Sequence, residues 1–597
     1  MNKTEKIICL VLGAVLIWYL FVETPRQTKA RQEAAAAQAQ AAAEAQAQAE
    51  TNDVAQVSAP VEKAAAAPAA APAVQERKVE NPSVPEQTVV LENDDVKLEL
   101  STWGAVVKKA TMKKFARDVG KISDDNPAVE LDFSSSPLGE LGGMTMAGFA
   151  PNAAYEVKSQ TSNCVVFANS FATRAVTLES GYRIVYADKF HLADGSTSVA
   201  YGDAISLGAM AMGSSKNDLL SVDSLDARNA KGKPEVIHHC EGDSPLKPYL
   251  AGGSGGCSGA PDANGMPETA RVKIGPDEQK WIAVKNRFFV TALASSDAEI
   301  SGFDAEIARD MGSASYRPKS VAVRATFKNP GIDRTTTFYV GPKKQSLLWE
   351  LGMKDVMEFG MWRWLCYPLV WVLNLFNDWI PNYGVAIILL TILVRLIFWP
   401  LTHKSTVGMK KMQELQPKMK EIQAKFKDNP QRMQQETWAL YREAKVNPLS
   451  SCLPMLIQIP VFIALFNVLR SAVELRYASF LWIADLSEPE GLFASWFPFG
   501  GLNILPVLMA VTTALQSAFT PSTGDAAQKK MMMIFMPAMM LVMFYSFPSA
   551  LSLYWFLSNI FSIAQMAIIR RQTAKEQAVL VPEVIDPPVT RQMRRHS

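Results

Sequence analysis

The apolar stretch 384–401, GVAIILLTILVRLIFWPL, most constrains this chain because it contains one arginine, Arg395. A central arginine in a membrane helix costs from about 2.5 kcal/mol to well over 10 kcal/mol, so it usually faces protein or water. The apolar stretches hold no acidic partner for it, which predicts a wet cavity in which backbone oxygens, hydroxyls and water satisfy the guanidinium. Thr391 lies one helical turn earlier on the same face. The alternative is that Arg395 simply extends to the headgroups near the end of its span.

Composition divides the chain into a polar part and an apolar part. Of the 597 residues, 48% are hydrophobic and 20% charged, and the net charge of +2 indicates no class of partner. The six cysteines have no CxxC or finger-like spacing. They therefore indicate neither a disulfide framework nor a zinc module.

The N-terminal region predicts an anchor followed by a tether. A short basic flank precedes an apolar run at 7–22, and no small-residue cleavage site closes that run. This favours an uncleaved transmembrane anchor over residues 1–28, with its N-terminus in the cytoplasm, over a removed signal peptide. Residues 29–87 are mostly Ala, Gln, Glu and Pro, so they cannot bury a core and are predicted to form a flexible tether.

Short alternating apolar runs such as VKLELS, YRIVYA and VAVRATF fill residues 88–345. The pattern predicts a large antiparallel β-sandwich, which the anchor places in the periplasm. No G-x-S-x-G, H-E-x-x-H or P-loop motif occurs there, so nothing in the domain indicates catalysis. His238, His239, Cys240 and Cys257 lie in a Gly-rich region. They leave open a metal site, a Cys240–Cys257 disulfide or an ordinary loop.

Five apolar stretches in the C-terminal part predict transmembrane helices, which with the anchor make six. Several are only about 17 residues long, which implies a locally thinned bilayer. Before them, the aromatic-rich stretch 358–381 is interrupted by polar residues and predicts a helix lying in the membrane interface. The predicted spans are 384–401, 453–469, 502–519, 531–547 and 550–569.

Basic residues predict the orientation of the spans. The loop 403–451 carries ten Lys and Arg residues, and the last span ends in Arg570 and Arg571, followed by a tail at 572–597. Such basic flanks mark the cytoplasmic side. Both termini are therefore expected in the cytoplasm.

The cytoplasmic stretch 404–445 has helical periodicity but is too polar to span a membrane. Apolar residues recur every three or four positions on both sides of an Asp-Asn-Pro turn, which predicts a helical hairpin. Pro417 is expected to kink or divide its first helix. Two interpretations stay open, mutual packing of the two helices and contact with a partner protein. The stripe includes Met412, Leu415, Met419 and Ile422.

Several segments resemble the YidC membrane-protein insertases, namely VRLIFWPL, LQPKMKEIQ, KVNPLSSCLPMLIQIPVFIALF and FPSALSLYWFLSN. The likeness covers 382–571, and the anchor, tether and β-domain resemble the bacterial two-membrane form of the family. The resemblance implies a membrane protein with a six-span α-helical bundle, in which a five-helix insertase core encloses a positively charged groove open to the cytoplasm and to lipid. It assigns to this client-binding groove Arg395, Thr391, Phe462, Trp555 and Gln516.

The resemblance also implies a function, the insertion and folding of newly made proteins of the bacterial inner membrane, alone or with the Sec translocon. The implied partners are nascent membrane proteins, the Sec translocon, the ribosome and the lipid bilayer, without direct nucleic-acid binding, cofactor, metal or enzymatic reaction. Two other classes stay open. A solute transporter or channel normally needs titratable carboxylates in its spans or matched broken helices. An anchored periplasmic carbohydrate-binding protein would leave the apolar half unexplained.

Overall fold

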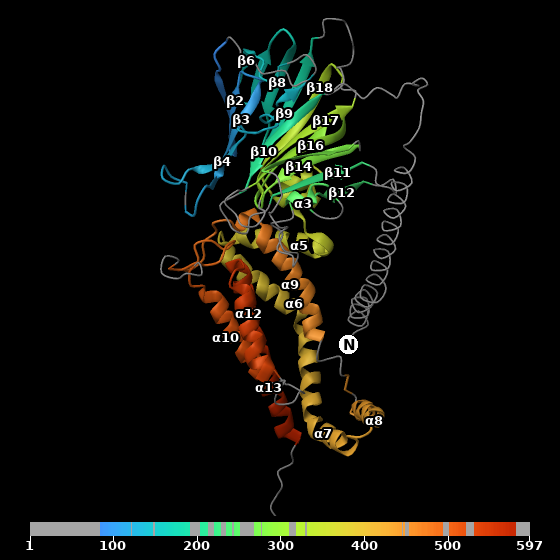
Figure 1. Ribbon diagram of the computed structural model, residues 1–597. Coiled ribbons are helices and arrows are strands. Elements are labelled where there is room, and N and C mark those ends of the chain that lie inside the picture. The colour runs from blue at the N-terminus through green and yellow to red at the C-terminus, as the bar shows by residue number, and fades with distance from the viewer. Residues whose placement is uncertain are drawn as a thin grey trace, which may run out of the picture. The chain divides into compact units, whose positions relative to one another are not determined.

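A β-rich region precedes a helical region in the computed structural model (Figure 1). The structure describes residues 84–580 except 121, 147–149, 192–202, 213–219, 228–233, 241–243, 251–267, 276–277, 310–317, 329–330, 445, 448–452, 494–500 and 521–529. The predicted anchor, nearly all of the tether and the tail from residue 581 therefore lie outside the described residues. We call residues 88–342 the β-domain and residues 345–580 the helical region.

The β-domain contains two sheets in which every described strand pair is antiparallel. One sheet has four strands in the order β1-β2-β3-β4, and the other has 14 strands. The predicted antiparallel sandwich of sheets is therefore confirmed. The strands are β1 Thr88–Glu92, β2 Val96–Ser101, β3 Val106–Ala116, β4 Ala128–Asp132, β5 Met144–Thr145, β6 Glu156–Gln160, β7 Cys164–Ala168, β8 Ala172–Leu178, β9 Arg183–Phe190, β10 Ala204–Ala211, β11 Ser221–Asp226, β12 Glu235–His238, β13 Thr269–Ile274, β14 Gln279–Lys285, β15 Phe289–Ser296, β16 Glu299–Arg309, β17 Pro318–Lys328 and β18 Asp333–Pro342.

Alternation of side chains explains why these segments form strands. In β8 and β9 every second residue is buried, as the two-residue period of a strand requires when one face covers a core. The two strands pair from Ala172 opposite Phe190 to Leu178 opposite Ile184 without a register shift. A one-residue slip would expose this whole buried set, so the hydrophobic pattern fixes the register.

Four charged residues lie inside the β-domain core. Arg174 and Arg334 both form ion pairs with Asp188, and Arg334 also pairs with Asp203. Their side chains have no solvent exposure. Arg174 further donates to the backbone carbonyls of Gly104 and Gly142 at 2.8 and 2.9 Å. These contacts hold distant loops against the sheet, and each buried charge has an opposite charge beside it.

The helical region follows Pro342 and matches the predicted apolar stretches closely. Its elements are α4 Gln345–Glu350, η3 Lys354–Met357, η4 Gly360–Trp362, α5 Arg363–Trp379, α6 Tyr383–Glu414, α7 Gln416–Lys425, α8 Pro430–Glu443, α9 Leu453–Ser471, η6 Val473–Leu475, α10 Ile504–Phe519, the π-helical turn η7 Met531–Phe535, α12 Met536–Phe544 and α13 Ser549–Leu580; a short helix α3, Lys247–Leu250, lies in the β-domain.

Helix α6 contains Arg395 and continues past the predicted span boundary at 401. Asn382 caps its start by accepting a hydrogen bond from the Val385 amide at 3.2 Å. Its 32 residues extend over about 48 Å, more than the roughly 30 Å of a hydrocarbon core. The span and the first helix of the hairpin are thus one helix. A break follows at Leu415, and Pro417 stands in the first turn of α7, where a proline costs no hydrogen bond.

The methionine-rich stretch begins with a π-helical turn that the sequence analysis did not anticipate. Met531–Phe535 forms this turn immediately before α12, and Pro537 stands at the start of α12. A proline has no amide proton for the carbonyl four residues earlier, so the helix rearranges around it.

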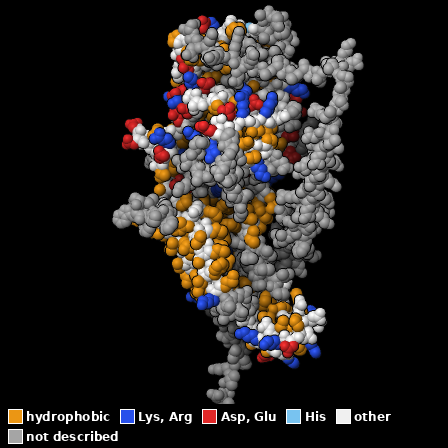
Figure 2. All heavy atoms as spheres, in the orientation of Figure 1, with side chains coloured by type: hydrophobic (Ala, Val, Ile, Leu, Met, Phe, Trp, Pro, Cys, Tyr) orange, Lys and Arg blue, Asp and Glu red, His pale blue; other side chains and the backbone are white. Residues whose placement is uncertain are grey.

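Apolar side chains cover much of the helical region's surface. Figure 2 shows hydrophobic side chains gathered over the helices, whereas charged side chains are interspersed over the β-domain. Two described helices, Tyr383–Glu414 and Ser549–Gln572, are long and apolar enough to cross a membrane, and three shorter apolar helices accompany them. The exposed hydrophobic residues of α10, η7 and α12 include Val507, Val511, Leu515, Met531, Ile534, Phe535, Met539 and Val542.

Helix α5 has two unlike faces. Cys366, Leu369 and Leu373 are buried against the rest of the helical region, whereas Trp371 and Trp379 are more than 60% exposed. Tryptophans on the outer face of such a helix are typical of a membrane interface.

Candidate functional site

Arg395 is half-buried on α6, close enough to Tyr554 of α13 for an electrostatic interaction. Tyr554 in turn accepts a hydrogen bond from the Gln458 amide of α9 at 3.0 Å. Among the described residues, no carboxylate lies within ion-pair distance of Arg395. The arginine therefore belongs to a polar group contributed by three helices, and its charge is not neutralised by this group.

Thr391 is fully buried one turn before Arg395. Its hydroxyl donates to the carbonyl of Ile387 at 2.7 Å, a bond within α6. The hydroxyl has only one proton, so its donor capacity is used inside the helix. The predicted role of Thr391 beside the arginine stays a prediction.

Aromatic side chains bring two other predicted site residues together. The rings of Phe462 on α9 and Trp555 on α13 meet edge to face, with centroids 5.0 Å apart. Phe544 of α12 lies 6.0 Å from Phe462 and 5.5 Å from Trp555. Edge-to-face contacts of this kind stabilise by roughly 0.5–1.5 kcal/mol beyond their burial. Helix α9 thus meets the consecutive helices α12 and α13 at one apolar cluster.

Gln516 is half-buried on α10. Its backbone carbonyl accepts from the amide of Thr520 at 2.8 Å. Within the described residues, no hydrogen bond or ring contact joins its side chain to the other predicted site residues. The predicted place of Gln516 in the groove stays a prediction.

Sequence reasoning missed the polar contacts that join the helices. Gln565 of α13 and Thr402 of α6 exchange hydrogen bonds at 2.8 and 3.3 Å. Asn559 of α13 donates to the hydroxyl of Thr513 on α10 at 2.8 Å. A polar side chain in an apolar span needs a partner, so the presence of Gln458, Asn559 and Gln565 in such spans was the available signal.

Part of the hairpin stripe packs within the hairpin itself. Met412 is buried, and Leu415, Met419 and Ile422 are half-buried. The hydroxyl of Tyr441, on α8, lies 3.0 Å from the sulfur of Met419. Mutual packing of α7 and α8 thus includes Met419, and contact of the stripe with a partner protein stays a prediction.

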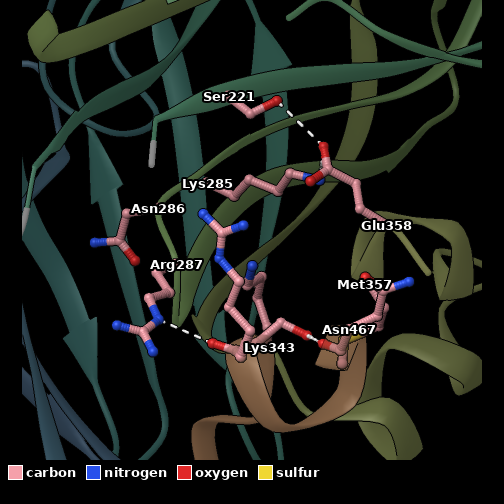
Figure 3. Close-up of a pocket in the computed structure, with 10 residues that line it drawn as sticks. Ser221, Lys285, Asn286, Arg287, Lys343, Met357, Glu358 and Asn467 are labelled. Atoms are coloured by element: carbon pink, nitrogen blue, oxygen red, sulfur yellow. Dashed lines mark hydrogen bonds and ion pairs between the residues drawn. The ribbon is translucent and has the colours of Figure 1, made fainter. Parts of the chain in front are cut away.

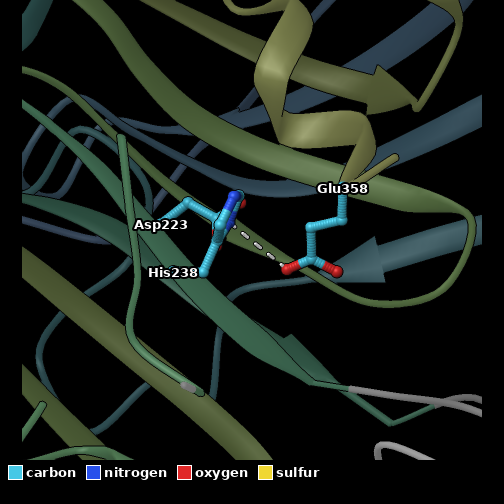
Figure 4. A group of neighbouring side chains, drawn as sticks. All are labelled: Asp223, His238 and Glu358. Atoms are coloured by element: carbon cyan, nitrogen blue, oxygen red, sulfur yellow. Dashed lines mark hydrogen bonds and ion pairs between the residues drawn. The ribbon is translucent and has the colours of Figure 1, made fainter. Parts of the chain in front are cut away.

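A second group of titratable side chains lies where the β-domain chain reaches the helical region (Figure 4). The candidate ligand atoms of Asp223, His238 and Glu358 all lie within 4.8 Å of one another. However, the Lys285 ammonium contacts both carboxylates, Glu358 at 2.8 Å and Asp223 more closely still. A fixed cation thus already occupies the place of a metal ion, and the group is a buried salt-bridge network.

The charges of this network reinforce one another. Burial by itself raises the pKa of Asp223. The charge of Lys285 and the hydrogen bond from His238 outweigh burial and lower this pKa to about 2. Burial works against protonation of His238, yet the bond and charge of Asp223 outweigh it and raise the pKa of His238. Lys285 likewise has a raised pKa, because Asp223 and Glu358 outweigh its burial. A protonated Lys285 and an ionised Asp223 follow at neutral pH.

Among the described residues, His239 and Cys240 of the Gly-rich region do not join a group that could hold a metal ion. His239 bonds to the hydroxyls of Ser224 and Ser244, and burial lowers its pKa to about 4. Cys240 carries a free thiol, whose pKa burial raises to about 12. Cys257 lies outside the described residues, as does the predicted disulfide.

Comparisons with known proteins assign both regions. Residues 375–576 match the family model described as 60Kd inner membrane protein, and residues 264–372 match the YidC periplasmic domain. The two matches define an inner-membrane protein that carries a periplasmic domain. The chain belongs to the YidC family, as its resemblance in sequence predicted.

Named relatives agree with this assignment. The chain is 42% identical over 299 residues to the membrane protein insertase YidC of Syntrophobacter fumaroxidans, covering 49% of this chain and 53% of the relative. It is 36% identical over 354 residues to that of Chloroherpeton thalassium, covering 57% and 60%. The matches thus span little more than half the length of these relatives. A solved structure of an active YidC insertase has a TM-score of 0.33 at 18% identity, covering 80% of this chain and 91% of that one, a likeness too low to support an argument.

Proposed function

We propose that this protein inserts newly made proteins into the bacterial inner membrane and helps them fold, alone or with the Sec translocon. The observation that carries the proposal is Arg395, a half-buried cation in a long apolar helix without a carboxylate partner among the described residues. Membership of a family whose named relatives are membrane protein insertases supports it. The proposed partners are nascent membrane proteins, the Sec translocon, the ribosome and the bilayer.

The proposed architecture has six spans, the N-terminal anchor and five helices of the insertase core. Helices α6, α9, α10, α12 with η7, and α13 supply the five, and α5 lies in the outer interface with its tryptophans. The basic hairpin of α7 and α8 lies in the cytoplasm, with both termini, by the positive-inside rule. The β-domain is then periplasmic, and its role in insertion is left to experiment.

The mechanism follows from the cost of moving a polar tail through hydrocarbon. Each unsatisfied polar group there costs several kcal/mol. Arg395 stands 12 residues into α6, about 18 Å from its outer end, and thus in the cytoplasmic half of a roughly 30 Å core. In this proposal a hydrated groove around it attracts an acidic tail from the cytoplasm and shortens the dry distance.

Apolar residues complete the proposed pathway. The cluster of Phe462, Phe544 and Trp555 joins the three helices along which a client helix would slide towards lipid. Exposed methionines of η7 and α12, such as Met531, Met536 and Met539, can adapt to clients of different shapes because thioether side chains are flexible. Burial of the client helix in lipid supplies the free energy, at roughly 0.8 kcal/mol per CH₂, so no nucleotide is required.

Depletion and replacement test the proposal. After the outer membrane is opened, added protease is expected to digest the translocated tails of small one- and two-span clients in control cells. In cells depleted of the protein the tails stay on the cytoplasmic side and are protected. Replacement with the wild-type chain should restore digestion, and normal digestion of the tails without this protein would contradict the proposed function.

A further inference from the structure

A pocket of about 110 Å³ lies between the β-domain and the outer end of α9 (Figure 3). A cavity needs only on the order of 15 Å³ to hold one water, so this pocket has room for a larger polar group. The β-domain contributes Lys285 and Arg287 to its wall, Lys343 directly follows β18, and α9 contributes Arg470 and Ser471. Both parts belong to the same compact unit of the chain.

Hydrogen bonds fix the shape of this pocket. Arg287 donates to the carbonyls of Arg470 at 2.8 Å and Ser487 at 2.6 Å and pairs with Glu488. On another wall Lys285 reaches the carboxylate of Glu358 (Figure 3) and donates to the carbonyl of Val356 at 2.8 Å. These bonds tie the β-domain to the helical region on two sides, so the pocket is held open by its own wall.

Cationic side chains outnumber carboxylates on the wall of this pocket. Four cationic side chains line it, those of Lys285, Arg287, Lys343 and Arg470, and Glu358 is the one carboxylate on its wall among the described residues. The carboxylates of Asp223 and Glu488 lie behind the wall, bound to Lys285 and Arg287. Lys285 and Arg287 are thus each paired with a carboxylate.

Arg470 differs from these paired cations. It forms no ion pair with a described residue, and its guanidinium lies 5.7 Å from the ring centroid of Phe466. It is half-buried at the end of α9. A ligand that carries one negative charge would pair with its guanidinium there. A phosphodiester carries one such charge and offers the acceptor oxygens that a guanidinium fork binds.

We propose that this pocket binds the phosphodiester headgroup of an anionic membrane lipid. The position of the pocket favours lipid as the source. It lies at the end of an apolar helix, and Glu358 precedes by five residues the start of α5, whose exposed tryptophans mark a membrane interface. This step rests on the proposed orientation, in which α9 ends at the outer leaflet. A lipid bound there connects the β-domain to the bilayer surface.

Lipid titration of the purified full-length protein tests the proposal. In native mass spectrometry from detergent, phosphatidylglycerol is expected to form a saturable one-to-one complex. Arg470→Gln should weaken this complex about tenfold or more, because it removes a charge-assisted contact. Arg470→Lys, which keeps the charge, should bind within a few-fold of wild type. Arg363→Gln removes an exposed arginine paired with Asp355 and should not change binding.

Three results would overturn the proposal. The first is equal phosphatidylglycerol binding by wild type and by a folded Arg470→Gln variant. The second is equal loss in the Arg363→Gln control, which would mean nonspecific attraction. The third is competition by inorganic phosphate at the concentration of the lipid, which would assign the pocket to free phosphate. Client insertion is measured separately, so a failure of the insertase function leaves the binding result interpretable.

Discussion

The β-domain and the helical region handle buried charge in opposite ways. In the β-domain, Arg174, Arg334 and Lys285 are buried, and each has a carboxylate in contact. In the helical region, Arg395 is half-buried in an apolar helix with only uncharged side chains, Tyr554 and Gln458, in its polar group. A paired buried charge can be explained by structure alone, whereas an unpaired one has a cost that suggests a function.

The largest expected effect comes from unpairing the charges of the β-domain core. Asp188→Ala leaves Arg174 without its carboxylate and removes one of two from Arg334. Breaking a buried pair on one side costs about 3–5 kcal/mol, so the free energy of unfolding should fall by that amount in urea titrations. Glu156→Ala, at an exposed pair with Lys158, should change it by less than about 1 kcal/mol. Equal stability of the two variants would mean that the paired buried charges do not stabilise the β-domain.

Replacing Arg395 should affect stability in the opposite direction to replacing Asp188. Arg395→Met removes a cation and leaves no buried carboxylate behind among the described residues. The thermal stability of the protein should therefore stay the same or increase, while client insertion falls. A loss of stability as large as that of Asp188→Ala would mean that Arg395 is a structural residue and would end the contrast between the two regions.

A smaller effect is expected at the polar partners of Arg395. Gln458→Leu leaves the Tyr554 hydroxyl without the donor that lies 3.0 Å away. A neutral hydrogen bond contributes about 1 kcal/mol, so an insertion rate that depends on this group should fall by several-fold at most. Asn559→Leu, which breaks a similar bond to Thr513 on α10, is the matched control for stability. An equal insertion defect in both variants would point to helix packing instead.

The smallest predicted effect is a pH dependence of the β-domain. The raised pKa of His238 means that its stabilisation is complete below the ordinary value of about 6.5 and is lost as the pH rises through its folded pKa. The free energy of unfolding should therefore fall slightly from pH 6 to pH 8.5. The fall should be under about 1 kcal/mol because His238 faces the already paired Asp223, Lys285 and Glu358. The same slope in His238→Asn would contradict this origin.

The contribution of Asp223 to stability depends on pH in the opposite direction to that of His238. The pKa of Asp223 is lowered to about 2, so its contribution is complete above its ordinary pKa of about 4 and is lost as the pH falls towards 2.

The sequence predicted the elements well because local patterns determine them. Alternating apolar residues in β8 and β9 and the apolar run of α6 need no distant partner to be recognised. The break at Pro417 likewise follows from the chemistry of a single residue. Element boundaries differed mainly at 401 and 569, where α6 and α13 run on. The polarity of a sequence changes at a membrane surface, but a helix need not end there.

The site was harder to predict because its contacts join distant residues. Gln458 and Tyr554 are 96 positions apart, and Lys285 meets Asp223 across 62 positions. Composition flags each such residue as polar in an apolar or buried setting but does not identify its partner. Gln516, which the resemblance assigns to the groove, has no hydrogen bond to the other predicted site residues among the described contacts, so its role stays a prediction.

The most direct test of the account varies the charge of Arg395 and of the client together. Insertion of a single-span client is measured by protease protection, with its translocated tail carrying zero, two or four acidic residues, for wild type, Arg395→Lys and Arg395→Ala. The account predicts that the Arg395→Lys variant retains much of the insertion activity because it keeps the cation. The Arg395→Ala variant should lose activity in proportion to the negative charge of the tail. If folded Arg395→Ala inserts the most acidic tail at the wild-type rate, electrostatic attraction by Arg395 is not the basis of insertion.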